Sequence, residues 1–78
     1  KNTIMEKKLI DYLLKEVTDY EKSLVQLTAE GNTPTEIAKA LGKTRRTIET
    51  QTYHLRKRFE CRSSIGLIVL FYRNKLIK

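Results

Sequence analysis

Apolar residues recur every three to four positions through the first 30 residues, which is the spacing of an α-helix with one buried face. The positions with this spacing are Met5, Leu9 and Tyr12 or Leu13 in residues 4–14, and Tyr20, Leu24 and Leu27 in the segment that follows Thr18. The pattern therefore predicts two consecutive amphipathic helices.

Predicted helix starts carry a threonine followed three positions later by a glutamate. This spacing allows a capping box, in which each side chain accepts a hydrogen bond from the other residue's backbone N–H. The three pairs are Thr3 with Glu6, Thr18 with Glu21, and Thr33 with Glu36. Pro34 strengthens the third start because proline suits the first helical position. We expect Gly31 and Gly42, which tolerate left-handed backbone, to end the second and third helices.

The third predicted helix is short and is followed closely by a fourth, which Thr44 caps and which runs to about Phe59. The inner face of the third helix consists of Ile37, Ala38 and Leu41. Ala38 is small enough for two helices to approach closely, and Gly42 permits a sharp reversal. This pattern is typical of a helix-turn-helix motif, whose second helix enters the DNA major groove.

The fourth predicted helix has an apolar face and an opposite polar face when its residues are placed at about 100° intervals around the helix axis. The predicted core face consists of Ile48, Thr52, Leu55 and Phe59. The opposite face consists of Arg46, Thr50, Tyr53 and Lys57, with Glu49 and His54 on its flanks. This mixture of cations and hydrogen-bonding groups suits the reading of base edges between phosphate contacts.

A fifth segment, residues 67–72, is apolar throughout and has the composition of a buried strand. We interpret it as a helix, because a lone strand has no partner to pair with and the rest of the chain has helical spacing. Ser63 or Ser64 is its expected N-cap, and Asn74 is expected to take left-handed backbone at its end. The predicted fold is all-α, with five helices or with four helices and a linker.

Positive charge is concentrated in the second half of the chain. The formal net charge is +7, yet residues 1–42 hold six basic and seven acidic side chains. Residues 43–62 hold seven basic and two acidic side chains, and residues 63–78 add three basic ones. A local block of this kind favours nucleic acid as a partner, and less often an anionic membrane surface. A solvated helix face that keeps the protein soluble is the alternative.

The sequence does not indicate a membrane-spanning protein, a disulfide-bonded protein, a metal site or an enzyme. The longest apolar run has six residues, far short of the roughly 20 that a membrane-spanning helix needs. The single cysteine, Cys61, excludes an internal disulfide framework, and His54 has no partners at metal-ligand spacing. No phosphate-binding glycine loop or paired-carboxylate motif indicates an enzyme. We expect a cytoplasmic protein without cofactor or metal. Because Lys1 is not an initiator, we expect the chain to be a fragment, a processed product, or one that carries leftover residues ahead of Met5.

The region of the predicted motif resembles the LuxR/GerE-type DNA-binding domain. The resemblance begins with Glu30-Gly31-Asn32-Thr33-Pro34-Thr35-Glu36-Ile37-Ala38-Lys39-Ala40-Leu41 and continues with Thr44-Arg45-Arg46-Thr47-Ile48, Leu55, Arg58-Phe59 and Cys61. Val17-Thr18 with Glu21 is similar to the family's opening, and Leu76-Ile77 to its ending. The resemblance implies a four-helix, helix-turn-helix transcription regulator that binds DNA as a dimer. We therefore expect that domain over residues 17–78, with an extra N-terminal helix or linker at 1–16.

This resemblance also indicates which residues contact DNA. In family members the base-reading positions correspond to Glu49, Thr50 and Tyr53. Together with the expected phosphate contacts, the predicted DNA-binding set is Thr35, Thr44, Arg45, Arg46, Thr47, Glu49, Thr50, Tyr53, His54, Lys57 and Arg58. Capping explains Thr44 equally well. Glu49 either accepts from a cytosine amino group or pairs with Arg45 or Tyr53.

Several residues depart from the family pattern. The departures are Gln51 where the family usually has His, Lys43 where it prefers Ile or Val, Ser23 for an acidic residue and Ser64 for a common Arg. Two of the three base-reading positions Glu49, Thr50 and Tyr53 are usually smaller or basic in the family, which leaves the preferred DNA sequence open.

The last predicted helix has two apolar stripes. Leu67, Ile68 and Phe71 fit a domain core, whereas Ile65, Val69 and Tyr72 form a second stripe. The resemblance implies that this helix forms a homodimer, so we assign the second stripe to the dimer interface. The alternative is that the N-terminal helix, with Leu9, Leu13 and Leu14, covers that stripe.

Two other interpretations remain open. A sigma-factor region-4-like module shares the Glu-Ile-Ala and Thr-Val spacing, but such modules commonly end near the position of Phe59. A protein-interaction module on the same scaffold would bind a regulator or an RNA polymerase subunit, and Glu49 and Gln51 favour it. Salt-sensitive binding to duplex DNA separates a regulator from an interaction module.

Overall fold

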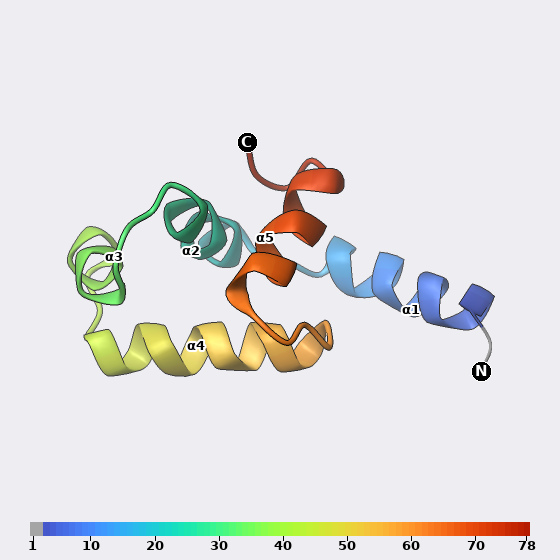
Figure 1. The fold of residues 1–78 in the computed structure, drawn as a ribbon, viewed down its shortest axis with the longest axis horizontal. Helices are drawn as coiled ribbons and strands as arrows, with labels where there is room; N and C mark the ends of the chain where they lie inside the picture. Colours follow the sequence, from blue (N-terminus) through green and yellow to red (C-terminus); the bar gives the residue numbers. More distant parts are fainter. Residues whose placement is uncertain (1–2) are drawn as a thin grey trace.

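Five α-helices follow one another in a computed structural model that describes the backbone of residues 3–78 and the side chains of residues 7–78 (Figure 1). They are α1 (Thr3–Lys15), α2 (Asp19–Ala29), α3 (Pro34–Leu41), α4 (Arg45–Arg58) and α5 (Ser64–Arg73). The described residues contain no strand, so the predicted all-α fold is confirmed. The apolar segment 67–72 is helical, because it lies inside α5.

The predicted caps set the starts of α2 to α5. Thr18 Oγ1 accepts from the Glu21 N–H at 3.1 Å, and the Thr18 N–H donates to Glu21 Oε1 at 3.0 Å. Thr33 and Glu36 form the same capping box at the start of α3, with Pro34 at its first position. Single hydroxyl caps from Thr44 and Ser63 begin α4 and α5. The predicted box of Thr3 with Glu6 lies outside the described side chains.

A left-handed residue follows each of α2 to α5, and two of these residues, Glu60 and Lys75, are at positions that the sequence did not predict. Gly31 and Gly42 have φ angles of 90° and 69°, as predicted. The prediction for Asn74 was wrong, since its φ is −98° and Lys75 takes the left-handed conformation at 60°. The Asn74 side-chain amide instead donates at 2.8 Å to the Leu70 carbonyl, which also accepts from the Asn74 backbone N–H at 3.2 Å, and the left-handed residue comes one position later. Glu60 (φ 55°) plays the equivalent part after α4.

The hydrophobic core lies where α2 packs on α5 and α3 packs on α4. Its most deeply buried large side chains are Phe71, Leu24, Ile48, Leu55 and Val25. Phe59 and Phe71 meet edge to face with 5.7 Å between ring centroids. After α5 the chain returns to the core through Ile77, and the Lys78 N–H donates to Gln26 Oε1 at 2.8 Å.

Helix α1 projects from one side of this core (Figure 1) and contributes to the 40 Å long dimension of the molecule. Leu14 is buried, and Ile10 and Leu13 pack partly against the core. Leu9 and Tyr12 face solvent, with 58% and 60% of their surface exposed. Only one face of the C-terminal half of α1 therefore joins the core.

Candidate nucleic-acid interface

Helices α3 and α4 are joined by the tight turn that the sequence predicts. Gly42 is the left-handed C-cap of α3, and the Lys43 N–H donates back to the Ala38 carbonyl at 2.8 Å. Ala38 is buried, which lets the two helices approach closely. Helix α4 runs along one edge of the molecule, with α3 at its N-terminal end, α2 and α5 above it, and α1 beyond its C-terminal end (Figure 1). Its outer side is therefore open along its length.

This outer side presents the polar face expected from the helix spacing. Arg46, Thr50, Tyr53 and Lys57 are all exposed, whereas Ile48, Leu55 and Phe59 on the inner side are buried. Thr52, predicted on the core face, is half-buried. We call this exposed set the outer face of α4; it consists of Arg46, Thr50, Tyr53 and Lys57. It has a long cationic side chain at each end and two hydroxyl-bearing side chains between them.

Tyr53 lies at the centre of a small cationic group. Its ring centroid is 5.8 Å from Arg56 Cζ and 5.9 Å from Lys57 Nζ. The exposed His54 ring lies 5.8 Å away at a tilted angle. Because 49% of Tyr53 remains exposed, its phenol is available to a ligand while cations surround it.

Glu49 is paired within its own helix. Its carboxylate lies 3.2 Å from Arg45 Nε, one turn earlier, and both side chains are largely exposed. This matches the expected alternative in which Glu49 pairs with Arg45. The two charges offset each other, so Arg46 and Lys57 carry the excess positive charge of the outer face.

Arg58 points toward α2 rather than along the outer face. Its guanidinium lies 3.0 Å from the Glu21 carboxylate, whose side chain is only 18% exposed. Partial burial by itself would raise the pKa of Glu21. Hydrogen bonds from Arg58 and Thr18, together with the charge of Arg58, outweigh that effect and lower the pKa below its ordinary value of 4.5.

Three threonines near the turn were predicted to contact DNA. Thr44 caps α4, whereas Thr35 is exposed. Thr44 Oγ1 accepts from the Thr47 N–H at 3.1 Å and lies 2.9 Å from Thr47 Oγ1, to which it donates. These bonds occupy the Thr44 hydroxyl, and Thr47 is half-buried. Thr35 is exposed near the start of α3.

Two clefts border α4. One, of about 510 Å³, is lined among others by Glu49, Tyr53, Arg56 and Arg62. Arg56 braces this side by donating from Nη1 to the Arg62 carbonyl at 3.0 Å. The second cleft, of about 190 Å³, lies on the flank toward α2, and its lining includes Tyr20, Glu21, Gln51, His54 and Arg58.

Sequence reasoning left three interacting residues out of the site. They are Arg56, Lys43 and Gln51. The Tyr20 hydroxyl donates to Gln51 Oε1, and Lys43 Nζ lies 5.5 Å from the Tyr20 ring centroid. The departures of Lys43 and Gln51 from the family pattern were the available signal. That both residues contact the same tyrosine depends on how α2 packs and could not be derived from spacing.

The second stripe of α5 is exposed in the part of the chain whose side chains the structure describes. Ile65, Val69 and Tyr72 are 72%, 41% and 63% exposed. Leu13 and Leu14 of α1 contact the core instead of this stripe.

Other chemistry is sparse in the described part of the chain. Cys61 is half-buried against the core, and burial raises the pKa of its thiol despite the nearby charge of Arg56. Residues 7–78 hold no cluster of three or more His, Cys, Asp or Glu side chains that could hold a metal ion. None of the helices described is both long and apolar enough to cross a membrane.

Comparison with known proteins places this arrangement in a family. A family model described as bacterial regulatory proteins, luxR family, matches residues 15–71. No curated protein and no solved structure matched the chain significantly. The matched region begins at the end of α1 and includes α2, α3 and α4 and most of α5. The chain belongs to the luxR family of bacterial regulatory proteins, whose GerE-type helix-turn-helix domains are DNA-binding regulators rather than enzymes.

Proposed function

We propose that this protein is a sequence-specific transcription regulator that inserts α4 into the major groove of DNA. The observation that supports this most directly is the outer face of α4, where Arg46 and Lys57 flank Thr50 and Tyr53 on an exposed surface. Cations at the two ends suit the phosphates along the groove, and the hydroxyl groups between them suit base edges.

Each predicted contact has a proposed role in this complex. Arg45, Arg46, Lys57 and Arg58 contact phosphates, and Thr35, Thr44, Thr47 and His54 add polar contacts at the edges of the groove. Glu49, Thr50 and Tyr53 read bases. Arg45 and Arg58 are held by Glu49 and Glu21 in the chain without DNA, so their phosphate contacts require these ion pairs to rearrange or to be shared.

The regulator acts as a homodimer in this proposal. The exposed apolar stripe Ile65, Val69 and Tyr72 of α5 supports it, since pairing two such stripes would remove both from water. A two-fold dimer would present two copies of α4 to inverted half-sites about one helical turn apart. Residues 17–78 form the DNA-binding domain and residues 1–16 its N-terminal extension, in a cytoplasmic protein for which RNA polymerase is a further candidate partner.

Duplex selection followed by a salt titration tests this function. DNA bound from a random pool would be sequenced, and the affinity for the enriched duplex would be measured by fluorescence anisotropy at several salt concentrations. If about six phosphates are neutralised per protomer, log K should fall against log salt with a slope near −5. Failure to enrich any sequence, combined with weak and salt-insensitive binding, would favour the protein-interaction module.

A further inference from the structure

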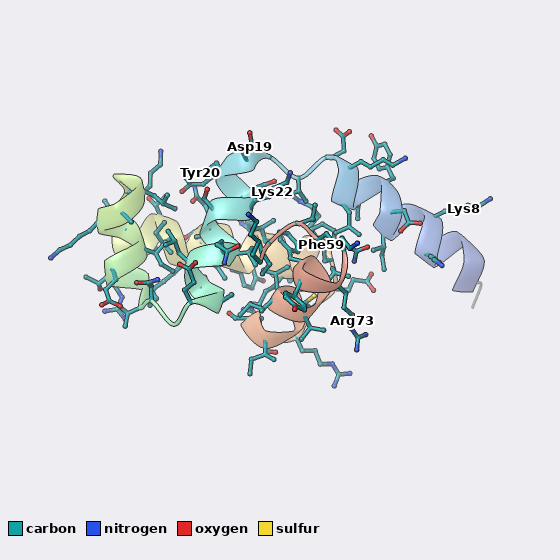
Figure 2. All side chains as sticks on the ribbon, turned by 90° about the horizontal axis from the view of Figure 1, so that it is seen from above. Lys8, Asp19, Tyr20, Lys22, Phe59 and Arg73 are labelled. Atoms are coloured by element: carbon teal, nitrogen blue, oxygen red, sulfur yellow. The ribbon has the colours of Figure 1, made fainter. Side chains whose placement is uncertain are left out.

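One tyrosine side chain joins the turn of the helix-turn-helix to the recognition helix. Tyr20 is the second residue of α2, and Figure 2 shows it on the side of α2 toward α3. Lys43 Nζ lies 5.5 Å from the centroid of its ring. Its hydroxyl donates to Gln51 Oε1 on α4. Lys43 and Gln51, both departures from the family pattern, thus contact the same side chain.

The charge of Lys43 remains available to a ligand. An aromatic ring attracts an ammonium group through its quadrupole but carries no formal charge to neutralise it. In the described part of the chain Lys43 forms no ion pair, whereas Arg45 and Arg58 are paired with Glu49 and Glu21. Lys43 is also exposed. It is therefore a full positive charge whose side chain contacts an aromatic ring.

The position of Lys43 suits a phosphate better than a base. It lies in the turn immediately before the N-terminus of α4, where the exposed N–H groups of a helix favour anions. Its contact with Tyr20, which also bonds Gln51, places its ammonium on the side of α4 toward α2 rather than on the outer face. About half to two-thirds of protein–DNA hydrogen bonds go to phosphate and sugar oxygens, and lysine is among the residues that make them.

We propose that Lys43 is a DNA phosphate contact and that Tyr20 is the positioning residue that holds it, with Gln51 fixing the Tyr20 ring. The proposal rests on the proposed function, because it requires α4 to lie in the major groove. A free lysine loses rotamer freedom when it binds, and its contact with Tyr20 reduces that loss by restricting the side chain beforehand. Both α2 and the turn then take part in anchoring the recognition helix.

Salt titrations of single variants test the phosphate contact. Lys43→Ala should reduce the magnitude of the slope of log K against log salt by about 1. Lys8→Ala is the matched control, because Lys8 is an exposed lysine on α1, far from Tyr20 (Figure 2), and it should leave the slope unchanged. A wild-type slope in the Lys43→Ala variant would overturn the contact. Absence of salt-dependent binding by the wild type would instead overturn the proposed function.

A double-mutant comparison tests the positioning role. In a Tyr20→Leu background, the affinity lost on Lys43→Ala should shrink, because the lysine is no longer held. In a Tyr20→Phe background, which keeps the ring, most of that loss should return. An equal loss in all backgrounds would overturn the role of Tyr20. Thermal unfolding verifies that each variant is folded, and Gln51→Ala replaces Tyr20→Leu if the leucine variant does not fold.

Discussion

The Arg58 guanidinium lies 3.0 Å from the Glu21 carboxylate, and this ion pair joins α4 to α2. The same carboxylate accepts a hydrogen bond from the Thr18 N–H at 3.0 Å and so completes the capping box of α2. One acidic side chain therefore stabilises the start of one helix and its contact with another. Its lowered pKa reflects both interactions, since each favours the ionised form.

Acid should remove this contribution to stability. Because the pKa of Glu21 is lower in the folded than in the unfolded chain, the stabilisation is complete above the ordinary value of 4.5 and is lost as the pH falls through the folded pKa. We expect Glu21→Gln to reduce the free energy of unfolding by about 1 kcal/mol at pH 7. The difference from wild type should narrow below pH 4.5, as measured by urea unfolding at several pH values.

Asp19→Asn is the control for that measurement. Asp19 also belongs to the first turn of α2, but its carboxylate lies 3.8 Å from Lys22 Nζ and is fully exposed. Its substitution should have little effect at any pH. A difference between Glu21→Gln and wild type that stayed constant down to pH 3 would contradict the role assigned to the Glu21 charge.

Interactions between residues three or four positions apart could be predicted from the sequence. Side-chain contacts between residues of different helices could not. The capping boxes at Thr18 and Thr33 each connect residues three apart, so spacing alone locates both partners. The pair of Arg45 with Glu49 is also local, and spacing raised it as one of two alternatives. The contact of Arg58 with Glu21 depends instead on the packing of α2 against α4.

The error at the end of α5 has a local cause. Asparagine is favoured in left-handed backbone, which is why Asn74 was the expected residue. Its side chain can also donate to a carbonyl of the last helical turn, as it does to Leu70, whose oxygen also accepts from the Asn74 backbone N–H. Asn74 could therefore either take the left-handed conformation or donate its side-chain amide to the helix end, and the amino-acid sequence alone does not decide between these two roles.

Two glycines should respond to alanine substitution with opposite signs. Gly42→Ala should destabilise the protein by about 1 kcal/mol, because φ at this position is 69°. Gly66→Ala should stabilise it by about 0.5–1 kcal/mol, since Gly66 lies inside α5 and an added Cβ would stand 3.6 Å from Cys61 Cβ, an ordinary contact. Thermal unfolding of both variants checks the prediction, and each 1 kcal/mol should shift Tm by roughly 4–8 °C. Shifts of the same sign would contradict it.

Removing the Glu49 charge should reduce the difference in affinity between the selected duplex and unrelated duplexes. In Glu49→Gln, Arg45 loses its carboxylate partner and becomes free for phosphate, and one negative charge leaves the groove-facing helix. We expect affinity for unrelated duplexes to rise severalfold and the preference for the selected duplex to fall. Competition titrations with selected and scrambled duplexes measure both quantities. Lower affinity for both duplexes would show that the Glu49 charge favours binding.

Substitutions on the outer face of α4 should distinguish residues that set the overall affinity for DNA from residues that set the preference between DNA sequences. Arg46→Ala and Lys57→Ala should each weaken binding to every duplex and reduce the salt slope by about 1. Thr50→Ala should leave the slope unchanged and alter the preference at one or two base pairs. A panel of single-base variants of the selected duplex would distinguish the two patterns. Unchanged binding by both basic variants would contradict the proposed docking of α4.

A charge on the apolar stripe of α5 should prevent dimer formation without unfolding the chain. Val69 is 41% exposed, so Val69→Glu adds a solvated carboxylate to the monomer but would bury one in the proposed interface. Sedimentation equilibrium over a concentration series should show dimers for the wild type and monomers for this variant. Leu9→Glu is the matched control, because Leu9 is an exposed apolar residue of α1 and should leave association unchanged. A wild-type chain that remained monomeric at high micromolar concentration would contradict a dimer formed without DNA.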